Sequence, residues 1–352
     1  MTKEQTMIKK VALVALGLLL AACGSAAPQG PRTLIVMTHD SFAVSEEVVA
    51  AFQAEHNVTV TFLKMGDTGS ATNAAILAGD QPLADVFYGV DNTFLSRALE
   101  GNIFEPYESP LLAEIPDHFE LDAEHRALPV DFGDVCLNYE KAYFEEAGIA
   151  PPANLEDLLK PEYKDLLAVQ NPATSSPGLA FLLATIGHFG EDGYLDYWQG
   201  LVDNGVKVVN DWETAYYSEF SQWGGTRPVI VSYASSPPVE LVFAEEPMSE
   251  PPTAAVVADG ACFRQIEFVG ILRGTQNREL AEAWVDFMLS TTFQEDMPMQ
   301  MFVFPVNENA QLQPEFVDYL EVSDETSVVS PADIAAKREE WINAWTQAVL
   351  RQ

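Results

Sequence analysis

The chain has 352 residues, of which 48% are hydrophobic, and a formal net charge of −35 at pH 7. This length and hydrophobic content are enough for two ordinary hydrophobic cores and exclude a disordered chain. The acidic excess argues against nucleic acid as a partner, because phosphate binding needs basic patches. A negative surface can steer a cationic solute inward, or it can simply keep an exported protein soluble.

The first segment has the form of an export signal. Two lysines precede a run of about a dozen apolar residues, which is too short to span a bilayer. The run ends in Leu20-Ala21-Ala22-Cys23, which resembles a bacterial lipobox. We therefore expect a signal peptide over residues 1–22, a lipid on Cys23 and a flexible tether over residues 23–32. Ordinary cleavage that leaves a free Cys23 is the alternative, and both place the protein outside the cytoplasm.

Strands and helices alternate through the first part of the mature chain. A buried strand at 33–38 is followed by an amphipathic helix. The strand at 58–64, a helix from about Thr68 to Ala78 and the strand at 84–89 continue the pattern. Such alternation predicts a mostly parallel sheet flanked by helices.

A second series of strands begins after about residue 127, with amphipathic helices between them. Its strands lie near residues 134–139, 166–170, 206–209 and 228–233. A longer strand at 262–272 could return to the first lobe. The last helix has a clear start, with Ser330 as N-cap, Pro331 at its first position and Asp333 at its third. We expect two lobes, residues 33–126 with 268–352 and residues 127–267.

Two cysteines follow Cys23, and each lies in a strand-like run. They are Cys136 and Cys262. An exported protein can keep a disulfide, but sequence alone leaves open whether these two are close enough to form one.

The tripeptide Ser-Ser-Pro occurs twice, each time where a strand gives way to a helix. The two copies are Ser175 to Pro177 and Ser235 to Pro237. Ligands of open α/β sheets lie beyond the carboxyl ends of the strands, so hydroxyls and free N–H groups at these turns could bind one. The alternative is two helix caps without a further role.

The sequence contains no recognisable catalytic or metal-binding motif. HExxH, CxxC, the phosphate-binding P-loop and the GxSxG elbow are all absent, and the five histidines are scattered. We therefore expect no enzyme activity, no catalytic residue, no bound metal and no cofactor. Aromatic residues do gather beside the polar turns of the second lobe, where Trp212 and Tyr233 could stack on a flat cation.

Several segments together resemble the thiamine-binding proteins of bacterial ABC importers, a branch of the periplasmic solute-binding superfamily. The matching stretches are THDSFA, ADVFYGVDN, LPVDFG, NPATSSPGL, DWETAY, VSYASSP and SPADIAAKREEWINAWTQAV. They occur in order over nearly the whole mature chain. The resemblance implies an α/β fold of the periplasmic-binding-protein type (type II-like), in which two lobes, each a mostly parallel sheet flanked by helices, enclose a ligand cleft.

The resemblance also implies a ligand site for thiamine or a thiamine phosphate. In it, aromatic faces hold the rings, a carboxylate offsets the positive charge and the serine turns hold the hydroxyethyl arm. The implied contacts are Asp67, Thr68, Ser175, Ser176, Trp212, Tyr233, Ala234, Ser235 and Ser236. Three further cleft candidates are His39, Asp91 and Phe302. The chain departs from the family pattern at His39 and Val239, where the family has Tyr, and at Phe302, where it has Trp.

As partners we expect an ABC permease with its cytoplasmic ATPase and the membrane that holds the lipid anchor, and we expect a monomer. Two other functions stay open. Sister families bind ferric iron through adjacent tyrosines, which Tyr216 and Tyr217 could imitate. A secreted thiaminase can share the two-lobe architecture and would use Cys136 as its nucleophile.

Overall fold

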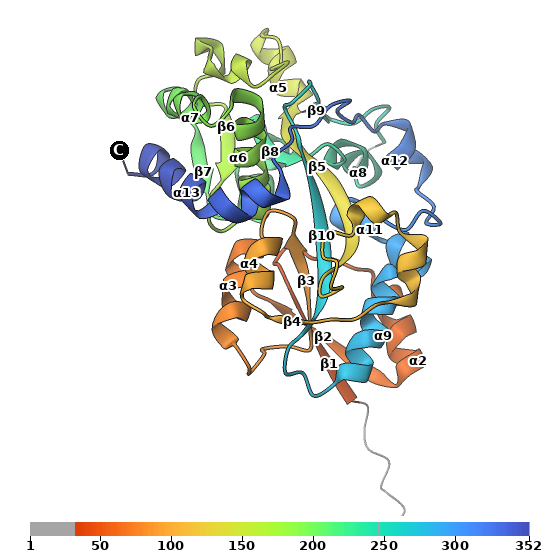
Figure 1. Ribbon diagram of the computed structural model, residues 1–352. Helices are drawn as coiled ribbons and strands as arrows, with labels where there is room; N and C mark the ends of the chain where they lie inside the picture. Colours follow the sequence, from red (N-terminus) through yellow and green to blue (C-terminus); the bar gives the residue numbers. More distant parts are fainter. Residues whose placement is uncertain (1–31, 245–246, 352) are drawn as a thin grey trace, which may run out of the picture.

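The computed structural model describes residues 32–244 and 247–351. The expected signal peptide, Cys23 and nearly all of the expected tether lie outside these residues. Within them the chain forms two α/β lobes that share two long strands (Figure 1). No helix in this part of the chain has the length and apolar content needed to cross a bilayer.

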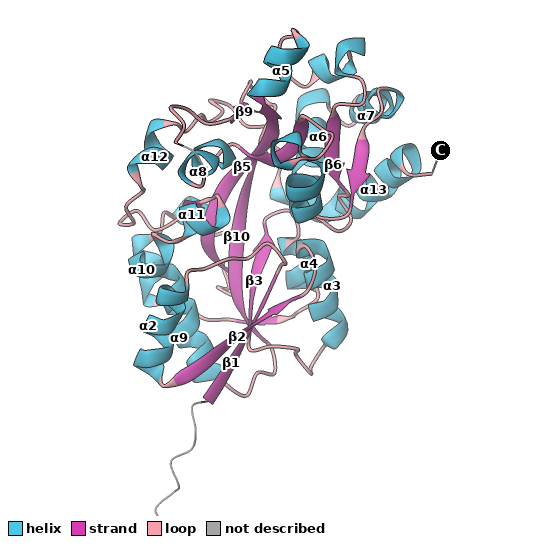
Figure 2. Cartoon of the chain, turned by 180° about the vertical axis from the view of Figure 1, so that it is seen from behind, coloured by secondary structure: helices cyan, strands magenta, loops and turns pink. Residues whose placement is uncertain are grey.

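The first lobe is built on three parallel strands in the order β2-β1-β3. Helices α3 and α4 cover one face of this sheet, and α2 and α9 cover the other (Figures 1 and 2). The strands are β1 (Arg32–Thr38), β2 (Val58–Lys64) and β3 (Val86–Asp91). The helices are α2 (Glu46–His56), α3 (Thr68–Ala78), α4 (Leu95–Glu100) and α9 (Arg278–Leu289).

The second lobe repeats this plan with three parallel strands in the order β8-β6-β7. Its strands are β6 (Leu167–Gln170), β7 (Lys207–Val209), β8 (Val229–Tyr233) and β9 (Thr253–Val256). Its helices are α5 (Lys141–Ala147), α6 (Ser176–Phe189), α7 (Tyr194–Asp203) and α8 (Ser236–Val242). Helix α6 is almost wholly buried, as its apolar sequence requires.

Two long antiparallel strands join the lobes. They are β5 (Leu128–Glu140) and β10 (Phe263–Leu272), and they pair with each other. On its other side β5 pairs with β8 of the second lobe, and β10 pairs with β3 of the first lobe. The strands of both lobes thus form one continuous mixed sheet: the expected parallel strands are present in each lobe, and the antiparallel strands carry the chain from one lobe to the other and back. The expected lobe boundaries fall just before β5 and inside β10, and they stay predictions.

Shorter elements complete the fold. They are β4 (Phe104–Glu105), β11 (Phe304–Pro305), α10 (Thr291–Gln294), α11 (Met297–Met301) and α12 (Pro314–Asp318). The 3-10 turns are η1 (Pro110–Glu114), η2 (Asp117–Phe119), η3 (Glu156–Leu159), η4 (Pro161–Tyr163) and η6 (Ser221–Trp223), and η5 (Thr214–Glu219) is a π-type turn.

The C-terminal helix α13 (Pro331–Val349) begins as the sequence predicts, because Ser330 Oγ accepts a hydrogen bond from the Asp333 backbone N–H at 3.0 Å. Its Trp345 packs edge to face on Trp198 of α7, with 5.4 Å between the ring centroids. The guanidinium of Arg338 lies over the Phe94 ring just before α4. The helix thus contacts both lobes.

Cys136 and Cys262 form a disulfide, which resolves the question left open by the sequence. Cys136 lies in β5, and Cys262 directly precedes β10. The bridge therefore ties together the two strands that join the lobes. Since the sulfur of Cys136 is bonded, it has no free thiolate to act as a nucleophile.

Candidate functional site

A cavity of about 200 Å³ lies between the lobes. Strand ends and turns of both lobes line it, which is where ligand sites of α/β folds lie. The lining from the first lobe and the joining strands is His39, Ser41, Phe42, Ala43, Lys64, Asp67, Thr68 and Glu267. The second lobe adds Ser176, Pro177, Trp212, Glu213, Tyr217 and Tyr233, and the segment after α10 adds Gln300, Met301, Phe302 and Val303.

Asp67 connects the two lobes at one side of this cavity. It is the N-cap of α3, where Oδ1 accepts from the Thr68 backbone N–H at 2.7 Å. Its Oδ2 accepts from the Trp212 backbone N–H of the second lobe at 3.1 Å. A neighbouring backbone bond from Gly69 N to Thr174 O, 3.0 Å long, also crosses between the lobes. Burial raises the pKa of Asp67 to about 6, although these hydrogen bonds favour the carboxylate.

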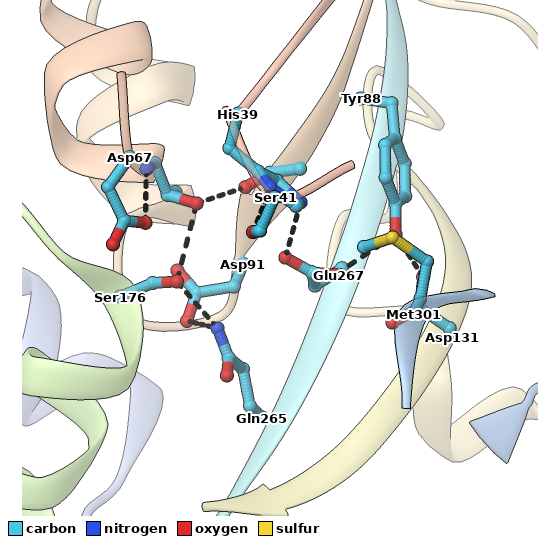
Figure 3. A network of polar contacts seen from close by, with 12 residues as sticks. His39, Ser41, Asp67, Tyr88, Asp91, Asp131, Ser176, Gln265, Glu267 and Met301 are labelled. Carbon is cyan, nitrogen blue, oxygen red and sulfur yellow. Dashed lines mark hydrogen bonds and ion pairs between the residues drawn. The ribbon is translucent and has the colours of Figure 1, made fainter. Parts of the chain in front are cut away.

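The first serine turn contributes one side chain to the cavity and one to the helix. Ser176 lines the cavity, and its Oγ accepts from Gln265 Nε2 at 2.8 Å. Ser175 is fully buried and caps α6 by accepting from the Gly178 N–H at 3.5 Å. The same Gln265 amide donates to Asp91 at 2.8 Å (Figure 3). Asp91 is thus a buried support behind the lining, and burial raises its pKa to about 7.

The second serine turn lies behind the lining, with Tyr233 in front of it. Tyr233 lines the cavity and donates its hydroxyl to Gln265 Oε1 at 2.9 Å. Ser235 donates to the backbone carbonyl of Phe302 instead of capping α8. Ser236 Oγ bonds Ser232 Oγ at 3.0 Å. These two serines and Ala234 are almost fully buried. In this structure they therefore support Tyr233 and Phe302 from behind and do not line the cavity.

The aromatic wall is centred on Trp212. Its indole stacks on Tyr216, with ring centroids 4.7 Å apart and an angle of 20° between the planes. Phe302 meets it edge on at 6.0 Å, and Tyr217 does so at 5.7 Å. The indole N–H donates to Ser232 Oγ at 3.1 Å. Trp212 is the first residue of a short helical segment that continues as the π-type turn η5.

A pair of acids at the base of the site was missed by sequence reasoning. Glu267 of β10 lies directly opposite Asp131 of β5, and the Tyr88 hydroxyl is 2.6 Å from Asp131 Oδ2 and 3.0 Å from Glu267 Oε2 (Figure 3). Burial raises the pKa of Asp131 to about 7 and that of Glu267 well above its usual value. Each of the two acids lies in an otherwise apolar, strand-like run of the sequence, and this could have indicated a buried acid. Carboxyl groups are rarely buried unless they are paired or hydrogen-bonded.

His39 faces this pair from the end of β1. Its Nε2 is 3.6 Å from Glu267 Oε1, and its Nδ1 is 2.8 Å from Ser41 Oγ. Burial and the nearby Lys64 ammonium lower the pKa of His39 to about 3, so the ring is neutral. Gly89, at φ +106°, leaves room for this ring, because a Cβ there would lie 2.3 Å from His39 Cδ2.

Residues 81–326 match the sequence profile of a family described as bacterial extracellular solute-binding protein. The chain belongs to this family. The thiamine-binding periplasmic protein of Salmonella typhimurium is 29% identical over 95% of this chain and 98% of its own length. The structure of a periplasmic thiamin binding protein superposes with a TM-score of 0.79 at 26% identity, covering 92% of this chain and 99% of the other.

Other solute-binding proteins of known structure share the fold alone. Iron-bound HitA from Pseudomonas aeruginosa superposes with a TM-score of 0.72 at 20% identity, covering 90% of this chain and 99% of that protein. The site, and not the fold, must therefore decide between ligands. Tyr216 donates its hydroxyl to Glu240, whereas Tyr217 lines the cavity, so the two tyrosines do not present a joint ligand set. Among the described residues, no group of three or more His, Cys, Asp or Glu is placed to hold a metal ion.

Proposed function

We propose that this solute-binding protein captures thiamine or a thiamine phosphate in the interlobe cavity and delivers it to an ABC permease driven by a cytoplasmic ATPase. The observation that carries the proposal is the lining itself, in which the rings of Trp212 and Tyr233 occur together with the carboxyl groups of Asp67 and Glu267. Aromatic faces and negative charge are what a flat organic cation needs.

Each part of thiamine has a matching group in the lining. The thiazolium and the aminopyrimidine are flat rings that can stack on the indole of Trp212 and the phenol of Tyr233. Asp67 can accept a hydrogen bond from the exocyclic amine. Thr68 and Ser176, which lie 3.3 Å apart between their side-chain oxygens, offer hydroxyls from opposite lobes to the hydroxyethyl arm. The relatives that bind thiamine by name support the same ligand.

The joining strands suit a hinge motion without a covalent step. In the closed state, Asp67 and Thr68 of the first lobe lie against Ser176 and Trp212 of the second lobe. Because hydrogen bonds join these residues here, this structure is already closed at that point. Under this proposal a lipid on Cys23 holds the monomeric receptor at the outer face of the membrane, close to the permease.

A fluorescence titration separates this function from iron transport. Thiamine should quench the emission of Trp212 in a colourless protein, because a stacked cationic ring contacts the indole directly. Ferric iron should produce no tyrosinate absorption band in the visible range, since Tyr216 is engaged with Glu240. A coloured iron complex together with no response to thiamine would contradict the proposal.

A further inference from the structure

The acids at the base of the cavity are not paired with a cation among the residues that the structure describes. In the described part of the chain, no lysine or arginine lies within ion-pair distance of Asp131 or Glu267. The Tyr88 hydroxyl donates a hydrogen bond to the pair, and the two carboxyl groups can share a further hydrogen bond when one of them is protonated. Two carboxyl groups this close cannot both ionise in a dry site, so one proton stays between them.

Of the two acids, Glu267 is the one that faces the cavity. It lines the cavity, whereas Asp131 is fully buried behind it. Gln265, two residues earlier on the same face of β10, contacts Tyr233 and Ser176, so this face of the strand forms the floor of the site. The register of β10 against β5 shifts immediately after Glu267, and irregularities of this kind often redirect a side chain toward a site.

His39 supplies an independent indication that a ligand belongs here. His39 is 4% exposed and lines the cavity, and its Nε2 has no hydrogen-bond partner in the protein among the described residues. The 3.6 Å to Glu267 is too long for a hydrogen bond. A buried polar atom without a partner in the protein is costly, so a ligand group that contacts both His39 and Glu267 would remove this cost.

The titratable side chains around Glu267 come from several elements that pack against it. Lys64 is the one among those named below that carries a positive charge. They are His39 after β1, Lys64 on β2, Asp67 before α3, Tyr88 and Asp91 on β3, Asp131 on β5 and Tyr233 on β8. The Lys64 ammonium donates to the Asp40 carbonyl at 2.7 Å. The local balance is thus negative as soon as the shared proton leaves.

We propose that Glu267 is a specificity-determining residue that faces the cationic ring of the ligand, and that it ionises on binding by releasing the proton it shares with Asp131. The O–H bond of the carboxylic acid breaks, the proton passes to the solvent, and the fixed positive charge of the ring takes its place beside two carboxylates. The site thereby selects a flat organic cation over a neutral ring of the same shape. This inference rests on the proposed function, which supplies the cation.

Calorimetric titration of the full extracytoplasmic chain at pH 7, in two buffers of different ionisation enthalpy, measures the proton release directly. Thiamine should release a proton, and its affinity should rise with pH by at most about tenfold per unit. An N-methylthiazolium should behave in the same way, whereas the corresponding uncharged thiazole should release none.

Three variants locate the effect. Glu267→Gln keeps the shape of the side chain and should abolish the proton release, flatten the pH profile and weaken thiazolium binding about tenfold while changing neutral thiazole by less than about twofold. Asp131→Asn removes one of the charges that raise the pKa of Glu267, so that pKa should fall and less of the proton should be released on binding, while affinity is retained. Glu146→Gln, on exposed helix α5 far from the cavity, is the matched control for loss of one acid.

The outcomes separate the two proposals. One outcome is that thiamine binds without releasing a proton and that Glu267→Gln and Glu146→Gln bind it with the same affinity. This would overturn the role of Glu267 and leave the proposed function standing. If thiamine does not bind but the N-methylthiazolium binds with proton release, the proposed function fails and Glu267 keeps its role. If no cation binds the wild-type protein, both proposals fail.

Discussion

Protein groups contact Trp212 at its backbone N–H, at its indole N–H and on one face of its ring. Asp67 accepts from its backbone N–H, Ser232 accepts from its indole N–H, and Tyr216 covers one face of the ring. The indole therefore has a fixed position, with its remaining surface in the lining of the cavity. A ring that is already fixed loses little conformational entropy when a ligand stacks on it.

Trp212→Ala should therefore weaken thiamine binding by about tenfold or more, which corresponds to about 1.4 kcal/mol. Trp223→Ala is the matched control, because this indole is exposed and lies outside the lining. Calorimetry on both variants measures the difference. Equal affinities for the two variants would show that the indole at 212 is not a ligand contact.

At the residue scale, sequence reasoning located Asp67, Trp212 and Tyr233, and the structure places all three in the lining. It did not separate Ser176, which lines the cavity, from Ser175, which caps a helix, because that depends on how α6 is rotated. The sequence signalled a buried acid at Asp131 and at Glu267, but their pairing could not be predicted, since it depends on the register of two strands far apart in the chain.

At the scale of elements, β5 and β10 determine how the lobes are joined. Alternating strands and helices predicted the parallel strands of each lobe, and the capping residues predicted the start of α13. The antiparallel pairing of β5 with β10 was not predicted, because hydrophobic periodicity carries no information on strand direction. The disulfide between Cys136 and Cys262 fixes these strands to each other.

Replacing Cys136 and Cys262 together with Ala should lower the free energy of unfolding by about 2–5 kcal/mol, because the bridge closes a long loop in the unfolded chain. The sequence separation is 126 residues. Urea denaturation of the oxidised protein and the double variant measures this difference. The reduced wild-type protein should resemble the variant, and unchanged stability in both would contradict the structural role of the bridge.

At the scale of the whole molecule, buried acids dominate the electrostatics. Burial raises the pKa of five carboxyl groups, namely Asp67, Asp91, Asp131, Glu240 and Glu267. The folded state holds protons on these groups at pH values where the unfolded chain has lost them. Their contribution to stability is therefore present at low pH and is lost as the pH rises through about 6 to 7.

The melting temperature should accordingly fall as the pH is raised from about 5 to 8. His39 has the opposite effect on stability, because its pKa is lowered to about 3 and the unfolded chain therefore binds that proton at a higher pH than the folded chain does. The five carboxyl groups outweigh this single histidine. The carboxyls whose pKa is lowered, such as Asp122 beside the Arg126 guanidinium, matter only below about pH 4. Calorimetric melts of the wild type and Asp91→Asn measure the slope, which the variant should reduce. A melting temperature that rises over this range would refute the assignment.

The central claim is that the interlobe cavity binds a flat organic cation, and calorimetric titration of the purified protein with thiamine tests it most directly. We predict saturable binding of one thiamine per chain, with the phosphorylated forms run in parallel to rank the ligands. An absence of binding heat for thiamine and both phosphates at about millimolar ligand, corresponding to a binding free energy weaker than about −4 kcal/mol, would contradict the account.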